Sequence, residues 1–206
     1  MIIAIDGPAA SGKGTLSRRL ASHFGFSHLD TGLLYRAVGE ALRAKGLDPA
    51  DEPAAVTIAE TLDTSALDRD RLSGSAIGEA ASIVAAIPAV RAALLDLQRR
   101  FAHSGKGAIL DGRDIGTVVC PEAEVKLFVT ASPEARARRR HRDDLAINPS
   151  VTYESVLADI LKRDARDSGR TVAPLVPAPD ARLLDTTDLD IEEAFQAAVR
   201  LVEAAG

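Results

Sequence analysis

A glycine-rich segment near the N-terminus constrains the fold of this chain more than any other feature. It reads Gly7-Pro8-Ala9-Ala10-Ser11-Gly12-Lys13, directly after the apolar run 2–5 and directly before a helical pattern. A strand, a glycine loop with a lysine and a helix in this order form a P-loop, whose backbone N–H groups converge on phosphate oxygens. The helix N-terminus adds positive potential there. We therefore predict a nucleoside triphosphate site made by Gly7, Pro8, Ala9, Ala10, Ser11, Gly12, Lys13, Gly14 and Thr15.

Short apolar runs recur along the chain and alternate with helical patterns. The runs that we interpret as strands are residues 2–5, 27–29, 108–110, 125–129 and 183–184. Strands that alternate with helices pair in parallel through crossover connections. The pattern therefore predicts an α/β fold with a five-stranded parallel sheet.

Helix signals lie between these runs. Leu16, Leu20 and Phe24 are four residues apart and Gly25 follows them, which predicts a helix that stops at Gly25. Asp30 is a suitable N-cap for a second helix that runs to about residue 46. Further helices are expected over 77–101 with a break near residue 88, from 132 to before 148, over about 152–167 and over 191–205, whereas 48–75 is expected to be irregular.

The composition excludes several classes of protein. The 206 residues are 46% hydrophobic and 27% charged with a net charge of −5, which is typical of a globular chain and not of a disordered one. Cys120 is the sole cysteine, so we expect a small buried apolar residue and no disulfide or zinc site. The start lacks the basic segment of a signal peptide, and no apolar stretch reaches the ~18 residues of a membrane span. We therefore expect a cytoplasmic protein that does not bind a membrane.

The residues after Lys13 indicate which class of P-loop protein this chain resembles. Gly14 stands where the commonest pattern has a hydroxyl residue, and Thr15 follows it as the expected hydroxyl for the Mg²⁺ shell. This Gly-Lys-Gly-Thr form resembles nucleoside monophosphate kinases more than GTPases. The sole asparagine, Asn148, is followed by proline, so the guanine-reading Asn-Lys-x-Asp motif is absent.

Three further motifs carry a specific resemblance. They are Asp30-Thr31-Gly32 followed by Tyr35-Arg36, the segment 111–117 with the sequence DGRDIGT, and the segment 163–170 followed by Ala173-Pro174-Leu175. From Met1 to the C-terminus the chain resembles the bacterial cytidylate kinase family. The resemblance implies transfer of the γ-phosphoryl group of ATP to CMP or dCMP with Mg²⁺ as cofactor, giving ADP and CDP or dCDP.

The resemblance also implies a domain organisation. It indicates one (d)CMP kinase domain over residues 1–206, a three-layer α/β/α structure of the nucleoside monophosphate kinase type. The core comprises about 1–47, 105–131 and 171–206, with a nucleotide-binding lobe at about 48–104 and a helical lid at about 132–170. Many members carry a β-rich insertion in that lobe, but segment 64–78 is too short for it.

Site residues follow from the matching positions. By resemblance, Arg36 and Arg113 bind the phosphate of CMP, and Lys13, Arg113, Arg163 and Arg166 form the catalytic set. Ser82, Arg91 and Asp114 match positions that read the cytosine edge. The full CMP set is Thr31, Tyr35, Arg36, Ser82, Arg91, Arg113, Asp114, Arg163, Asp167 and Arg170.

Two assignments come from position alone. Tyr35 is expected to cover the base because it immediately precedes Arg36. Asp111 ends the third strand, and we expect it to help Thr15 hold Mg²⁺ through water. The acceptor phosphate of CMP has a second pKa near ~6 and is already a dianion at neutral pH, so no general base is expected.

Simpler interpretations remain open for several of these residues. Arg163 and Asp167 are four apart on a helix, as in a surface ion pair of about 0.3–0.5 kcal/mol. Ser82 could instead be a solvent-exposed residue of a helix. Asp30 could serve only as a helix cap.

The arginine-rich run 136–142 invites a nucleic-acid interpretation. Asp143 and Asp144 follow it at once, and only 3% of the residues are aromatic, which leaves little to stack on bases. We therefore expect the arm of a lid and no nucleic-acid partner, with Arg136, Arg139 and Arg140 on one face. The expected partners are ATP and CMP or dCMP, bound by a monomer. Rival functions are a small P-loop kinase acting on UMP, AMP or shikimate, and a nucleotide-dependent switch.

Overall fold

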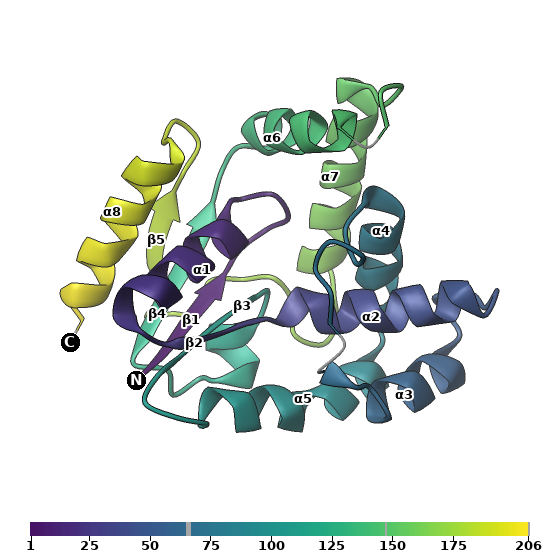
Figure 1. Ribbon diagram of the computed structural model, residues 1–206, viewed down its shortest axis with the longest axis horizontal. Coiled ribbons are helices and arrows are strands. Elements are labelled where there is room, and N and C mark those ends of the chain that lie inside the picture. Colours follow the sequence, from purple (N-terminus) through teal and green to yellow (C-terminus); the bar gives the residue numbers. More distant parts are fainter. Residues whose placement is uncertain (65–66, 147, 206) are drawn as a thin grey trace. The chain divides into compact units, whose positions relative to one another are not determined.

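The computed structural model describes residues 1–64, 67–146 and 148–205 (Figure 1). The chain divides into two compact units, a first unit of Met1–Leu29 with Arg99–Gly206 and a second unit of Asp30–Gln98. Within the segment 64–78 discussed above, residues 65 and 66 lie outside the described residues, as does residue 147 of the expected lid. Of the other residues, 64 and 67–74 lie in turns and irregular structure and 75–78 begin the next helix, and none of these described residues is in a strand.

The five expected strands are all present. They are β1 (Ile2–Asp6), β2 (Ser27–Asp30), β3 (Ala108–Gly112), β4 (Val125–Thr130) and β5 (Arg182–Asp185), in the order β2-β3-β1-β4-β5. β1 pairs in parallel with β3 and β4, and β4 with β5. Each strand extends one or two residues beyond the expected run, and the α/β fold with its five-stranded parallel sheet is confirmed.

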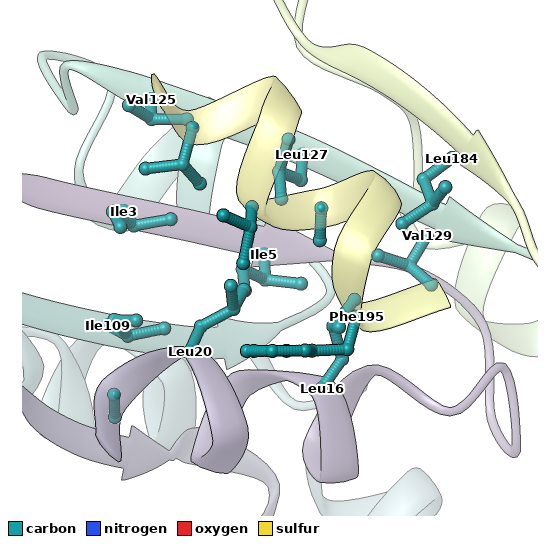
Figure 2. Packing of buried hydrophobic residues seen from close by; sticks show 14 residues of the cluster. Ile3, Ile5, Leu16, Leu20, Ile109, Val125, Leu127, Val129, Leu184 and Phe195 are labelled. Carbon is teal, nitrogen blue, oxygen red and sulfur yellow. The ribbon is translucent and has the colours of Figure 1, made fainter. Parts of the chain in front are cut away.

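One face of the sheet is covered by α1 (Lys13–Phe24) and α8 (Ile191–Glu203). Figure 2 shows Leu16 and Leu20 of α1 and Phe195 of α8 meeting the strand residues Ile3 and Ile5. α1 ends as expected, because Gly25 adopts the left-handed conformation with φ of 67° and its N–H reaches the carbonyl of Ala21. This packing fixes the loop between β1 and α1.

The segment after β3 contains an element that the sequence pattern does not indicate. Residues Ile115–Val119 form a short π-helix, η2, with Asp114 at its N-cap. π-Helical turns are rare and occur mostly at functional sites. Cys120 follows η2 and is fully buried, as expected for its small apolar role.

Two long helices follow β4. α6 (Pro133–Leu145) begins at Ser132, whose hydroxyl accepts the N–H of Ala135, and α7 (Tyr153–Ser168) begins at Thr152, whose hydroxyl accepts the N–H of Ser155. Both helices begin within one residue of the expected starts at 132 and about 152. The proline-rich connection 173–179 has no regular structure.

The second unit is helical. It contains α2 (Thr31–Ala44), α3 (Glu52–Glu60), α4 (Ser75–Val84) and most of α5 (Pro88–Ala102), packed around Leu34, Val38, Leu42 and Leu94. The break between α4 and α5 falls next to Pro88 as expected, with a bend of 99°.

Two predictions for this unit are wrong. Residues 48–75 are not irregular throughout, because α3 forms there; Asp51 accepts the N–H of Ala54 at 3.1 Å and Pro53 stands in the first turn. Asp30 occupies the N-cap position of α2, but its side chain makes no cap bond and pairs with Arg69 at 2.7 Å instead. Within this unit α2 packs on α3 and α4.

No single helix among the described residues is both long and apolar enough to cross a membrane. α4 and α5 reach the length and apolar composition of a membrane span only when the two helices are counted together across their bend.

Candidate active site

The loop between β1 and α1 has the backbone of a phosphate cradle. Gly7 has φ of 154°, and a Cβ there would lie 2.0 Å from the carbonyl oxygen of Val129, so only glycine fits. Ala10 and Gly12 also have positive φ, which turns successive N–H groups inward. The Lys13 ammonium donates to the carbonyl of Pro8 at 3.2 Å and is buried. The loop and its lysine are thus held in a shape that suits phosphate oxygens.

Two side chains from distant parts of the sequence donate hydrogen bonds to backbone carbonyl groups of this loop. The Thr186 hydroxyl donates to the carbonyl of Ser11 at 3.1 Å, and the Arg136 guanidinium donates to the carbonyl of Ala9 at 3.2 Å. Thr186 lies directly after β5 and also receives a hydrogen bond from Arg139 at 3.1 Å. The sequence analysis did not identify Thr186, because its contacts join segments that are 175 residues apart.

Arg136 also joins the two long helices. Its Nη1 and Nη2 atoms donate to the two carboxylate oxygens of Asp164 at 3.0 and 2.6 Å, and its Nε donates to the carbonyl of Ala131 at 2.9 Å. It is only 3% exposed. The other arginines of the expected lid face also have protein partners: Arg139 binds Thr186, and Arg140 pairs with Asp144 at 3.0 Å.

We expect Arg136→Met to lower the free energy of unfolding by about 2–3 kcal/mol, because it leaves Asp164 and two carbonyl groups without a charged donor. Chemical denaturation measures this difference. Arg138→Met is the matched control, since Arg138 lies exposed on the same helix and should change the value by less than about 0.5 kcal/mol. Equal losses in the two variants would contradict the buried anchoring of Arg136.

A buried carboxylate organises the arginines that follow β3 and α7. Asp167 accepts the Nε of Arg113 at 2.8 Å and also pairs with Arg170. Burial tends to raise the pKa of Asp167, but Arg113, Arg170 and then Arg163 outweigh it, so that its pKa is lowered overall. The interpretation of Arg163 and Asp167 as a surface pair is therefore wrong, because Asp167 is buried and pairs with Arg113 and Arg170.

Two other carboxylates lie at the same end of the sheet. Asp111 in β3 is buried and its Oδ1 lies 2.7 Å from Nε2 of His28. Asp6, the last residue of β1, accepts the N–H groups of Ile115 and Gly116 at 2.8 Å each. Burial raises the pKa of Asp6 to about 6, against the lowering effect of these two N–H groups. Sequence reasoning missed Asp6, although an acid at the end of an otherwise apolar strand is an available signal.

The expected Mg²⁺ ligands fit a site completed by phosphate and water. Thr15 is exposed in the first turn of α1, where Arg18 donates to its hydroxyl at 3.3 Å. No group of three or more metal-binding side chains occurs in the part of the chain that the structure describes. Mg²⁺ in kinases is usually held by one or two protein oxygens together with substrate phosphates. One hydroxyl and one carboxylate are therefore compatible with this cation.

In the second unit, Arg36 donates hydrogen bonds to the backbone of the segment 72–74. It donates to the carbonyl groups of Leu72 and Gly74 at 2.8 and 3.3 Å. Thr31, in the first turn of the same helix α2, is buried. These contacts fix the segment 72–74, which directly precedes α4.

Two of the remaining expected residues of this unit, Arg91 and Tyr35, lie next to each other. Arg91 donates to the carbonyl of Ala85 at 3.2 Å, and its guanidinium lies 5.4 Å from the centre of the Tyr35 ring. Tyr35 is only 7% exposed and packs with the apolar core, which does not fit the expected cover over a base. Ser82 is buried and, within the described residues, its hydroxyl has no hydrogen-bond partner. The alternative of a solvated Ser82 is therefore wrong.

The sequence comparisons agree with one another. The sequence model of the family described as cytidylate kinase matches residues 3–204. A cytidylate kinase of Azorhizobium caulinodans is 66% identical over 206 residues, which is 100% of this chain and 99% of that protein. A cytidylate kinase of Xanthobacter autotrophicus is 64% identical over 204 residues, 99% of this chain and 98% of that protein.

A solved structure supports the fold. The crystal structure of an uncharacterized protein from Eubacterium ventriosum matches with a TM-score of 0.58 and 15% sequence identity. The match covers 99% of both chains. At this identity the likeness bears on the fold alone.

Proposed function

Because this chain belongs to the cytidylate kinase family, we propose that it transfers the γ-phosphoryl group of ATP to CMP or dCMP, giving ADP and CDP or dCDP. The observation that carries this proposal is the match over residues 3–204, which includes the phosphate loop and the cluster of Arg113, Asp167 and Arg170. The protein is a kinase. The following assignments of individual residues belong to the proposal.

ATP is assigned to residues 7–15, with Lys13 on the transferred phosphate. The backbone of this loop supports the assignment, because its positive φ angles turn N–H groups toward one point. Mg²⁺, when bound, neutralises charge on the phosphates, and Thr15 with Asp111 would hold it through the hydroxyl and through water.

The CMP assignments follow the positions that match the family's motifs. In the second unit, Arg36 binds the phosphate, Ser82 and Arg91 bind the base, and Thr31 lines the site. In the first unit, Arg113 binds the phosphate and Asp114 reads the base. The buried Ser82 hydroxyl supports its role, because a buried hydroxyl group without a partner costs free energy that a ligand can recover. Tyr35 is assigned to position the Arg91 guanidinium through a cation–π contact with its ring.

Catalysis requires positioning and charge neutralisation more than proton transfer. The CMP phosphate, with a second pKa near ~6, is a dianion at neutral pH and attacks without a general base. Lys13, Arg113, Arg163 and Arg166 supply positive charge to the transferring group. The pairing of Asp167 with Arg113 and Arg170 sets the guanidinium groups before substrate arrives, which lowers the cost of ordering them in the transition state.

Residues 132–170 are assigned to a lid that excludes water. Closure of the lid would exclude the water that would otherwise hydrolyse ATP. The monomer expected from the sequence stays a prediction.

An acceptor panel tests the proposal. The wild-type protein is incubated with ATP and Mg²⁺, and ADP release is measured with CMP, dCMP, UMP, AMP and shikimate in turn. We expect turnover with CMP and dCMP at a kcat/KM at least ~10-fold above that with UMP. Turnover with AMP or shikimate alone would favour another P-loop kinase, and hydrolysis without any acceptor would favour a nucleotide switch.

We expect Asp114→Ala to reduce the preference for cytosine. Loss of a charged hydrogen-bond acceptor should lower the ratio of kcat/KM for CMP to that for UMP about tenfold or more. The KM for ATP should change less than about twofold. Asp143→Ala, at an exposed acid of α6, is the control. An unchanged ratio would remove Asp114 from base reading.

A further inference from the structure

One peptide group of the phosphate loop depends on a distant side chain for its orientation. It joins Ser11 to Gly12, and Gly12 has φ of 88°. Glycine adopts positive and negative φ about equally well. The local backbone therefore does not decide which way this peptide group faces, and a contact from outside the loop is needed to hold it.

Thr186 supplies this contact. It directly follows β5 and is only 3% exposed. Its hydroxyl donates to the carbonyl of Ser11 at 3.1 Å. Because a trans peptide group is planar, its N–H points opposite to its C=O. The Ser11 carbonyl faces Thr186, so the N–H of Gly12 is directed to the opposite side.

Arg139 fixes the role of this hydroxyl as a donor. Its Nη1 donates to the Thr186 hydroxyl at 3.1 Å, and its Nη2 donates to the Thr186 carbonyl. A guanidinium only donates, so the hydroxyl proton stays available for an acceptor. The carbonyl groups of Ser11 and Thr130 share it at 3.1 Å each. Since the Thr130 carbonyl also accepts the backbone N–H of Thr186 at 2.8 Å, the hydroxyl matters more for Ser11.

The preceding part of the loop is held in the same manner. Arg136 donates to the carbonyl of Ala9 at 3.2 Å, which directs the N–H of Ala10 away from Arg136. Arg136 and Arg139 are three residues apart in α6, so one helix supports both peptide groups, directly at Ala9 and through Thr186 at Ser11.

We propose that Thr186 is a positioning residue for ATP, whose hydroxyl holds the Ser11–Gly12 peptide group with the N–H of Gly12 toward the phosphates. N–H groups that are oriented before the ligand arrives bind phosphate without the cost of reordering the loop. The inference rests on the proposed function and deepens it, since it takes residues 7–15 as the ATP site.

The test is Thr186→Val, which keeps the shape of the side chain but removes the hydroxyl. Binding of ATP with Mg²⁺ is measured by isothermal titration calorimetry without CMP, so the result does not depend on turnover. We expect the Kd for ATP to rise about tenfold, while the KM for CMP at saturating ATP changes less than about twofold. Thr186→Ser retains the hydroxyl and should bind ATP within about twofold of the wild-type protein. An unchanged Kd in Thr186→Val would overturn the inference.

Thr187→Val is the matched control from the same loop. The Thr187 hydroxyl donates to Asp185 at 2.6 Å and accepts the N–H of Ser132 at 2.9 Å, and neither bond involves the phosphate loop. Its Kd for ATP should stay within about twofold of the wild-type value. A rise equal to that of Thr186→Val would show a general effect of the loop and overturn the inference.

Inorganic tripolyphosphate separates an effect on the phosphates from an effect on the rest of the nucleotide, because it has the phosphate chain of ATP without base or ribose. If Thr186 acts through the N–H of Gly12, Thr186→Val should weaken the binding of tripolyphosphate and of ATP by the same factor. A loss of affinity for ATP alone would place the effect on the base or the ribose and overturn the inference.

A second comparison covers the case in which Thr186→Val does not fold, as judged by circular dichroism. Thr186→Ala and Thr186→Ser both lack the threonine methyl group and differ from each other only in the hydroxyl. Thr186→Ala should bind ATP about tenfold more weakly than Thr186→Ser. Equal Kd values would overturn the inference. A wild-type protein that binds ATP but does not phosphorylate CMP would instead contradict the proposed function.

Discussion

Lys13→Met is expected to lower kcat about 10³-fold, the largest effect of any single substitution considered for this protein. Lys13 is the positive charge of the phosphate loop and is buried, with its ammonium on the carbonyl of Pro8. Methionine preserves much of the length and the apolar stem, so α1 should keep its packing on the sheet. The loss therefore reflects missing charge on the transferring phosphoryl group.

The measurement is steady-state ADP release with saturating ATP and CMP. Lys106→Met serves as the control, because Lys106 is an exposed lysine of the same unit and lies outside the site. Its kcat should stay within about twofold of the wild-type value. A Lys13→Met protein with wild-type kcat would contradict the catalytic role of this lysine.

Arg113→Ala is expected to lower kcat/KM for CMP at least ~10²-fold, the scale of a lost charge-assisted phosphate contact. The structure adds a second expected effect. Arg113 is the partner that lowers the pKa of buried Asp167 most, so its removal should also destabilise the fold by about 2 kcal/mol. Arg170 still pairs with Asp167, and the protein should remain folded.

Kinetics and denaturation on the same preparation separate these two effects of Arg113. Arg138→Ala, at an exposed position of α6, should change neither quantity appreciably. Arg113→Ala with near wild-type kcat/KM would contradict phosphate binding by Arg113. Unchanged stability would show that Arg170 alone balances the Asp167 charge.

Features encoded in neighbouring residues were predictable from the sequence. The phosphate loop, the five strands, the helix end at Gly25 and the helix starts near 132 and 152 each depend on residues a few positions apart. Helix α3 was missed, although Asp51 followed by Pro53 is a start signal of the same kind. The rest of 48–75 is rich in acidic residues and has no clear helical period, which hides this signal.

Contacts between distant segments could not be predicted in this way. Asp6 and Ile115 are 109 residues apart, and Ala9 and Arg136 are 127 apart. Asp30 shows the same limit locally, because the nearby cap competes with a more distant ion pair to Arg69. Spacing shows which groups a helix end offers, but only the folded chain shows which partner each group has.

The pairing of Arg136 with Asp164 has a mechanical consequence. Arg136 lies in the first turn of α6 and Asp164 near the end of α7, so their two hydrogen bonds join the start of one helix to the last turns of the other. Arg136 also holds Ala9, which makes this point a fixed pivot. The part of α6 from Arg136 to Leu145 forms a lever about 14 Å long. A rotation of only 10° about the pivot would carry the far end about 2 Å while the phosphate loop stays still.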